Sequence, residues 1–181
     1  MKNLLILFLL SVAGLATAET AFPDRYVTNG LTLDLKGTAR MKIGGLISLY
    51  DAALYLPADV PAERVLDDVP KRLELIYLKT MSKAVLLEAG AKGLASNVPP
   101  ARLQALQPKI DQINQWYQTV KPRDVYTLTY RPGQGTELAF NGQRQGVVDG
   151  ADFAAAYYTI WLGTNAPRPE VRDALLGRPR K

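Results

Sequence analysis

The sequence predicts an α+β fold in which an antiparallel sheet is covered by helices on one face. Residues 125–148 contain three short runs of strand-like residues, separated by the turn-forming clusters 132–135 and 141–142. After Gly150 the apolar period changes from two to between three and four, which indicates a helix. Because a meander alone leaves an apolar face uncovered, we expect this helix to pack against it.

Strand-like patterns also occupy the first half of the chain. They are rich in β-branched, apolar or aromatic residues and are bounded by glycines. The predicted elements are a strand at 31–35, a turn at Lys36-Gly37, strands at 38–43 and 46–56 with a hairpin or bulge at Gly44-Gly45, and a strand at 72–78.

Helical spacing separates these strands from the meander and closes the chain. The predicted helices are 61–66, 82–94, a segment from 103 to 120, 153–162 and 169–176. Ser82 is placed to cap the second of them. Pro108 lies inside the third pattern, so we expect a break or kink at Gln107 and a second helix starting there.

The first residues resemble an export signal. Lys2 is followed by an almost wholly apolar run from 4 to 15, and Ala16-Thr17-Ala18 is an A-x-A cleavage pattern. We therefore expect a signal peptide at 1–18, cleavage after Ala18, and a single domain at 19–181 that is periplasmic or secreted and has no membrane span. An uncleaved anchor is the alternative, although the apolar run is short for a span.

The composition excludes several kinds of chemistry. The chain has no cysteine and no histidine, which removes imidazole-based triads and the usual zinc sites. We expect no metal and no cofactor. The net charge of +5 and the pI of about 9.4 could indicate a nucleic-acid partner, but the cations are scattered and the export signal argues against one.

Several phrases, in order, resemble the chalcone isomerase-like family, in particular its exported bacterial branch. They are Gly37-Thr38-Ala39-Arg40, Asp51-Ala52-Ala53-Leu54-Tyr55-Leu56-Pro57, Tyr130-Arg131-Pro132-Gly133-Gln134-Gly135-Thr136, Asn141-Gly142, Ile160-Trp161-Leu162-Gly163 and Leu175-Leu176-Gly177. The resemblance runs from about 31 to 177. It implies an open-faced β-sandwich of chalcone isomerase type, with a ligand cleft between the antiparallel sheet and a helical layer on one face.

The resemblance also implies a role for Arg40. Plant enzymes of this family close a chalcone to a flavanone, and related proteins bind fatty acids without known catalysis. In both, an arginine that matches Arg40 faces the cleft and handles a negative charge. A guanidinium suits this task because it stays charged when partly buried and holds an oxyanion through two parallel hydrogen bonds.

Other polar positions of the enzymes are altered here. Their tyrosine at the start of the helix after the mid-chain strand falls on Met81, and a helical asparagine falls on Glu88. A threonine late in the first long strand becomes Tyr50, and the threonine of the final core helix falls near Thr159 or Ile160. These departures favour binding over catalysis.

The candidate ligand-binding residues are polar side chains that the resemblance places around the cleft: Arg40, Tyr50, Tyr77, Ser82 and Thr159. No catalytic residue is assigned. Strand alternation alone favours a solvent-facing Arg40, and the resemblance reverses this in favour of an orientation toward the cleft. The aromatic cluster of Tyr157, Tyr158 and Trp161 is assigned to the core instead of to a ligand surface.

Three functions are therefore considered. The leading one is non-catalytic binding of a small amphipathic organic acid, such as a fatty acid, with Arg40 at the carboxylate. The second is an isomerase of the intramolecular lyase type acting on an unknown substrate. The third is an envelope interaction module with a closed cleft. The sequence leaves the ligand and the oligomeric state open.

Overall fold

The computed structural model describes residues 22–28 and 30–178, so the predicted signal peptide at 1–18 lies outside the described residues. The elements follow in the order β1 (Arg25–Thr28), β2 (Leu31–Ile43), β3 (Ile47–Leu56), the short 3-10 helix η1 (Ala62–Arg64), β4 (Lys71–Tyr77), α1 (Lys83–Asn97), α2 (Pro100–Trp116), β5 (Val125–Arg131), β6 (Gly135–Phe140), β7 (Gln143–Val148), α3 (Ala151–Tyr157), α4 (Thr159–Leu162) and α5 (Pro169–Leu175).

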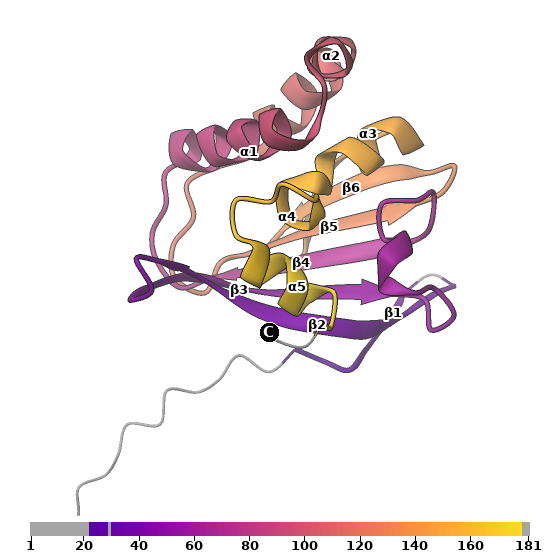
Figure 1. Ribbon diagram of the computed structural model, residues 1–181, viewed down its shortest axis with the longest axis horizontal. Helices are drawn as coiled ribbons and strands as arrows, with labels where there is room; N and C mark the ends of the chain where they lie inside the picture. Colours follow the sequence, from indigo (N-terminus) through magenta and orange to yellow (C-terminus); the bar gives the residue numbers. More distant parts are fainter. Residues whose placement is uncertain (1–21, 29, 179–181) are drawn as a thin grey trace, which may run out of the picture.

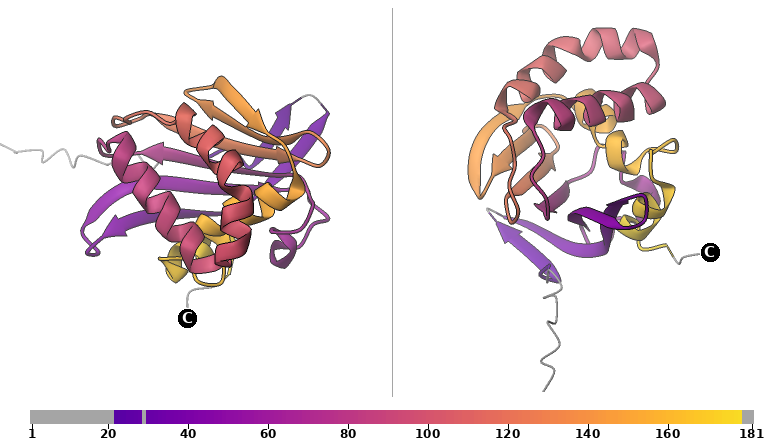
Figure 2. Two further views of the ribbon diagram at one scale, coloured as in Figure 1. Left: turned by 90° about the horizontal axis from the view of Figure 1, so that it is seen from above. Right: turned by 90° about the vertical axis from the view of Figure 1, so that its left-hand side faces the viewer.

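The described strands form one antiparallel sheet of seven strands, and each strand pairs with its neighbours in the sequence. The sheet is curled, and the α-helices lie on one side of it (Figure 1, Figure 2). The predicted α+β class is confirmed. The main core fills the space between sheet and helices, while a small second cluster around Leu33, Ala53 and Tyr55 lies on the outer face.

The long strand β2 differs from the prediction in one respect that matters for the site. Lys36-Gly37 does not form a turn; the strand is continuous there, with a register shift between Leu35 and Gly37. Such a bulge adds one residue and exchanges the faces of the sheet beyond it. Leu35 accordingly packs on the outer cluster, whereas Ala39 and Met41 pack on the core under the helices.

The hairpin predicted at Gly44-Gly45 is confirmed. Both glycines have positive φ, 57° and 73°, a conformation that other residues adopt at a cost. The Leu46 amide donates to the Ile43 carbonyl at 3.2 Å, which closes the turn between β2 and β3.

The helices make a layer of uneven depth. The short helix α3 supplies the fully buried Phe153 to the core, and Tyr158, between α3 and α4, is also fully buried. The longer helix α1 packs mainly on α4, α2 and α3, while α2 packs on β7 and α5 packs on β2 (Figure 1). Helix α1 therefore lies farther from the sheet than α3 and α4 do, as Figure 2 also shows.

Three helix predictions need correction. The helix predicted at 61–66 shrinks to the 3-10 turn η1, and the one at 153–162 is divided at Tyr158 into α3 and α4. The segment from Pro100 to Trp116 is one helix that contains Pro108, so no second helix begins at Gln107. Proline removes a single backbone donor, and the buried Leu106 and Ile110 on either side keep the helix packed.

The C-terminal end of α5 approaches the sheet so closely that only glycine fits at position 37. A Cβ atom built there would lie 2.1 Å from the carbonyl oxygen of Ala174 and 2.7 Å from that of Leu175. Both obstacles are backbone atoms, so a side chain at this position would push α5 away from β2.

Replacement of Gly37 by alanine should therefore lower the free energy of unfolding by about 1–3 kcal/mol, the usual cost of overpacking. Thermal and urea unfolding measure it. Gly90→Ala in α1 is the matched control, because its Cβ would meet nothing closer than a side-chain carbon of Ile160 at 3.8 Å. We expect that variant to be as stable as the parent or up to about 1 kcal/mol more stable. Equal stability of the two variants would contradict the close packing of α5.

Candidate ligand cavity

An apolar cavity of about 280 Å³ lies between the sheet and the helix layer. Its floor comes from β2, β3 and β4, its roof from α1 and α2, and its side from α3, α4 and the start of α5. The main lining residues are Met41, Tyr50, Tyr77, Met81, Leu86, Leu87, Gly90, Leu94, Ile110, Asn114, Tyr117, Tyr157, Ile160, Trp161, Pro167, Arg168 and Val171.

Strand register brings the floor together. Met41 of β2 is opposite Tyr50 of β3, and Tyr50 is opposite Tyr77 of β4. Residues opposite each other in antiparallel strands point to the same face. The rings of Tyr50 and Tyr77 meet edge to face with centroids 5.8 Å apart, a favourable aromatic geometry.

Helix α1 is joined to the side wall by an asparagine. The Asn97 side chain donates to the carbonyl of Gly93 at 2.9 Å, and its oxygen accepts from the backbone amide of Asn165 at 2.8 Å. Gly93 itself lies against Ile160 of α4, because a Cβ there would be 3.1 Å from the Ile160 Cα. The C-terminal half of α1 is thus fixed to α4 and the loop after it, which defines the width of the cavity.

Tyrosine hydroxyls are the main polar groups in the cavity. Tyr157 donates to the hydroxyl of Tyr117 at 3.0 Å, and both residues are buried. Trp161 contacts the Tyr157 ring edge to face, at 6.2 Å between centroids. Hydroxyls in this setting can donate to an oxyanion or accept from a protonated acid.

Burial determines the charge state of these tyrosines. Removal from water disfavours the phenolate, which raises the pKa of Tyr50 to about 12 and those of Tyr77 and Tyr117 well above 10. The pKa of Tyr157 is raised by the same cause. At neutral pH these four phenols stay protonated, so they serve as hydrogen-bond donors and acceptors and not as general bases.

Two cations line the cavity where it meets the surface. Among the described residues that line the cavity, the cations are Lys92 of α1 and Arg168 before α5, and there is no acid. The Lys92 amine is paired with Glu88 at 2.6 Å, and the nearest acid of Arg168 is Glu170 at 3.8 Å. Side-chain exposures of 72% for Lys92 and 40% for Arg168 place both at the surface.

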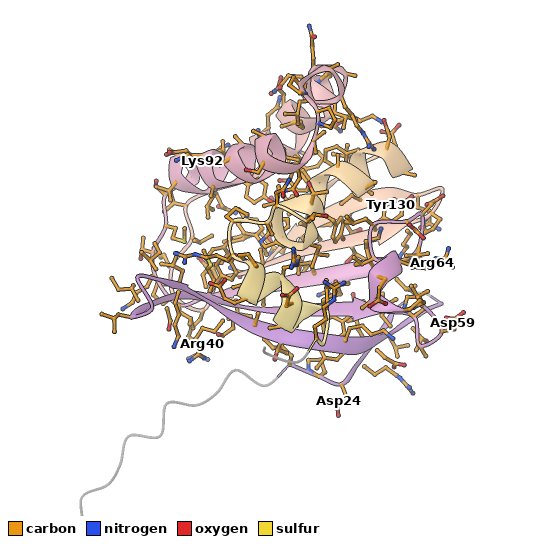
Figure 3. All side chains as sticks on the ribbon, in the orientation of Figure 1. Asp24, Arg40, Asp59, Arg64, Lys92 and Tyr130 are labelled. Carbon is orange, nitrogen blue, oxygen red and sulfur yellow. The ribbon has the colours of Figure 1, made fainter. Side chains whose placement is uncertain are left out.

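Arg40 lies outside this cavity. Its guanidinium donates two hydrogen bonds to the carboxylate of Asp51, at 2.6 and 2.9 Å, in a bidentate pair. Asp51 has only 7% of its side chain exposed, while Arg40 has 40%. Figure 3 shows the labelled Arg40 and Lys92 on opposite sides of the sheet. The bulge after Leu35 accounts for this orientation, because it turns Ala39 and Met41 inward and Arg40 outward.

A second, open and more polar groove runs past Arg40 at the edge of β2. Its charged lining residues are Arg40, Lys42, Asp51, Arg168 and Glu170. Arg168 and Val171 line both the groove and the apolar cavity. The beginning of α5 therefore separates the two hollows, and Arg168 is the cation common to both.

The other predicted site residues divide as follows. Tyr50 and Tyr77 line the cavity together. Ser82 is exposed and caps α1, accepting from the Val85 amide at 3.3 Å, which confirms the predicted cap. Thr159 is buried behind the wall and donates to the Ala156 carbonyl at 2.5 Å. Ser82 and Thr159 are not among the lining residues.

Sequence reasoning missed part of the lining. Tyr157 and Trp161 were assigned to the core, yet both line the cavity, whereas Tyr158 is a core residue whose hydroxyl donates to the Leu128 carbonyl at 2.9 Å. Tyr117 and Asn114 of the α2 region were not singled out. Helical spacing could have indicated that Tyr157, Ile160 and Trp161 share one side of the chain and line the cavity together.

Two features are absent from the part of the chain that the structure describes. Within it no group of three or more His, Cys, Asp or Glu side chains is placed to hold a metal ion. Nor does any helix in it have the length and apolar character needed to span a membrane.

A curled antiparallel sheet covered by a helical layer defines an α+β fold, here with an apolar cavity between the two layers. The chain belongs to the chalcone isomerase-like family, whose sequence pattern matches residues 14–177. Among solved structures, it is similar to the crystal structure of a fatty-acid binding protein from Arabidopsis thaliana. The two share 16% sequence identity and a TM-score of 0.63, over 86% of this chain and 91% of the plant chain. No curated protein sequence matches the chain.

The raised tyrosine pKa values predict how stability depends on pH. Tyrosines in the unfolded chain have a pKa near 10, and the buried tyrosines have a higher one. Between these two pKa values the folded state therefore binds more protons than the unfolded state does. The buried tyrosines should then make their full contribution to the free energy of unfolding below about pH 10, and this contribution should fall as the pH rises toward 12.

Urea unfolding at several alkaline pH values measures this slope. The Tyr50→Phe and Tyr77→Phe variants should each show a shallower decline than the parent, because one buried phenol is absent. Identical slopes in all three proteins would show that the cavity phenols are not protected from water.

Proposed function

We propose that the chain binds a small amphipathic organic acid, such as a fatty acid, without chemically changing it. The apolar tail would occupy the cavity under α1, and the carboxylate would lie at the mouth near Arg168 and Lys92. The observation that carries this proposal is the cavity itself, which combines apolar walls with cations confined to its entrance.

Cavity size limits the ligand. Sites for small molecules usually measure roughly 300–1,000 Å³. The cavity of about 280 Å³ is just below the lower end of that range, which favours an acid of short or medium chain length over a large one. The plant neighbour is a fatty-acid binding protein, which supports a ligand of this class but, at 16% identity, does not identify it.

The chemistry of the lining favours binding over catalysis. The four cavity tyrosines hold their protons at neutral pH, so none is available as a base. Their hydroxyls could receive a carboxylic acid or the polar end of another ligand. The guanidinium of Arg40 is engaged with Asp51 on the far side of β2, so a contact with a ligand in this cavity would require that pair to separate.

Binding is tested with octanoic and dodecanoic acids added to the mature protein in detergent-free buffer. Tryptophan fluorescence serves as the readout because Trp161 lines the cavity. We expect saturable binding with one acid per chain. Gly90→Phe should abolish it, because a benzyl group at this lining position fills the space below α1. Gly90→Ala, which keeps the space open, should bind as the parent does.

The position of the carboxylate is tested by removing cations one at a time. Arg168→Ala should weaken binding roughly tenfold, the usual value of one charge-assisted hydrogen bond. Arg64→Ala, at an exposed pair with Asp67 in the loop before β4, is the control and should leave affinity unchanged. A larger loss in Arg40→Ala than in Arg168→Ala would place the head group in the open groove and restore the anchoring role predicted for Arg40.

We also propose that the protein is exported and that its N-terminal segment is removed after Ala18. The support is the charged, apolar and A-x-A pattern of residues 1–18. Intact mass measurement of the protein after expression with its full N-terminus should give a chain that begins at Glu19, recovered from the periplasm or the medium. A full-length chain retained in the membrane fraction would indicate the uncleaved anchor.

A further inference from the structure

Large apolar side chains gather at the tip of the hairpin between β2 and β3. Among the described residues, the large apolar side chains that remain exposed are Val27, Ile43, Leu46, Ile47 and Val85. Three of these lie within residues 43–47, here called the hairpin tip, with exposures of 51% for Ile43, 90% for Leu46 and 54% for Ile47. Exposed apolar groups that cluster, unlike scattered ones, indicate a contact surface.

The fold does not require these side chains. Gly44 and Gly45 with their positive φ angles make the turn, and the last strand pair is Ile43 with Ile47. At 90% exposure Leu46 contributes little to the core, so a polar residue could replace it without loss of packing. The needs of folding therefore do not explain why the tip is apolar.

Basic residues surround the tip at the same end of the sheet. Lys42 pairs with Ser48 across the hairpin. Lys79 follows Leu78, whose amide donates to the Leu49 carbonyl at 2.8 Å. Lys42, Ser48 and Leu49 lie within a few residues of the turn, and the bond from Leu78 to Leu49 brings the backbone next to Lys79 to the same end of the sheet.

The loop before β5 adds two more cations to this end. The Arg123 amide donates to the Tyr77 carbonyl at 2.7 Å, at the end of β4 from which the chain leaves for α1. Lys121 follows Val120, which bridges to Met81. The acid of this loop, Asp124, already accepts from the Lys121 amide at 2.7 Å and from Asn141 at 2.9 Å. The basic ring is defined as Lys42, Lys79, Lys121 and Arg123.

The hairpin tip is also close to the cavity. Met41 and Tyr50, which pair with each other and line the cavity, immediately precede Lys42 on β2 and follow Leu49 on β3. The hairpin thus extends the cavity floor into solvent. In Figure 1 this hairpin and the start of α1 project at the same end of the molecule.

We propose that the hairpin tip and the basic ring dock on the surface of an anionic phospholipid bilayer, from which the acid enters the cavity. Apolar side chains at a protruding tip can insert among lipid tails, and the cations around them would meet lipid phosphates. Charge complementarity favours this occupant over a second copy of the chain, whose basic ring would repel the first. The purpose of docking rests on the proposed function, but docking itself does not.

Co-sedimentation of the mature protein with vesicles tests the proposal. Vesicles of phosphatidylglycerol and phosphatidylcholine should bind the protein, vesicles of phosphatidylcholine alone should bind it weakly, and added salt should reduce the difference. Leu46→Ser should weaken partitioning roughly tenfold. Val27→Ser is the matched control, since Val27 is 67% exposed on β1 away from the tip, and it should behave as the parent does.

A separate set of variants tests the contribution of the basic ring to vesicle binding. Replacing Lys42, Lys79 and Lys121 together by glutamine should weaken binding to the anionic vesicles roughly a hundredfold, because each cation near such a surface contributes about fivefold. An equal change of charge elsewhere, at Lys36, Arg64 and Arg131, should have a much smaller effect. Equal losses in the two triple variants would show that only net charge matters and would overturn the docking surface.

The same experiments distinguish a failure of membrane docking from a failure of acid binding. Equal vesicle binding by Leu46→Ser and Val27→Ser overturns docking through the tip, as does a dimer that disappears in Leu46→Ser without vesicle binding. Octanoic acid affinity measured without vesicles should be unchanged in Leu46→Ser. A parent protein that docks through the tip but binds no acid would support docking and contradict the proposed function.

Discussion

Burial of one face of the sheet is the constraint on which the rest of the structure depends. Seven neighbouring strands in sequential order give a sheet with two faces, and the helices cover one of them. The apolar residues of β4, Leu73, Leu75 and Tyr77, alternate with partly exposed ones and fix which face is inside. The helices that follow bury their apolar sides against this face or against one another.

The helices meet this constraint at two depths, and the cavity follows from the difference. Helices α3 and α4 fill the sheet surface directly with Phe153 and Tyr158, and α1 rests on α4 through the close contact at Gly93. Beyond the edge of α4, α1 has no short helix beneath it. Side chains of the sheet and of α1 line the remaining space without filling it. The cavity is thus a result of stacking one helix on another over a curled sheet.

Much of this architecture could be predicted from local sequence. The meander, the Gly44-Gly45 hairpin and the Ser82 cap each depend on a few adjacent residues, and the structure contains all of them. Strand β1 was not predicted, because four residues at a sheet edge give too short a pattern. The helix through Pro108 was also missed, since tertiary packing outweighed one lost hydrogen bond.

The candidate site was less predictable for a physical reason. A bulge changes which face a residue occupies, and nothing in the residues around Lys36 shows that one extra residue is inserted there. With a regular strand, Arg40 would lie on the face opposite Leu33 and Leu35, under the helices. With the bulge, it lies on the outer side beside Asp51. Tyr50 and Tyr77 lie on strands that continue in regular register with each other, and both line the cavity.

The proposal that the cavity holds a small organic acid is tested most directly by native mass spectrometry of the protein. The protein would be purified from its own cellular compartment without detergent, and the small molecules extracted from it would then be identified. We expect one organic acid per chain in the parent and none in the Gly90→Phe variant. A parent protein that is empty, and that stays empty when fatty acids are added, would contradict the claim and favour an interaction module with an unused cavity.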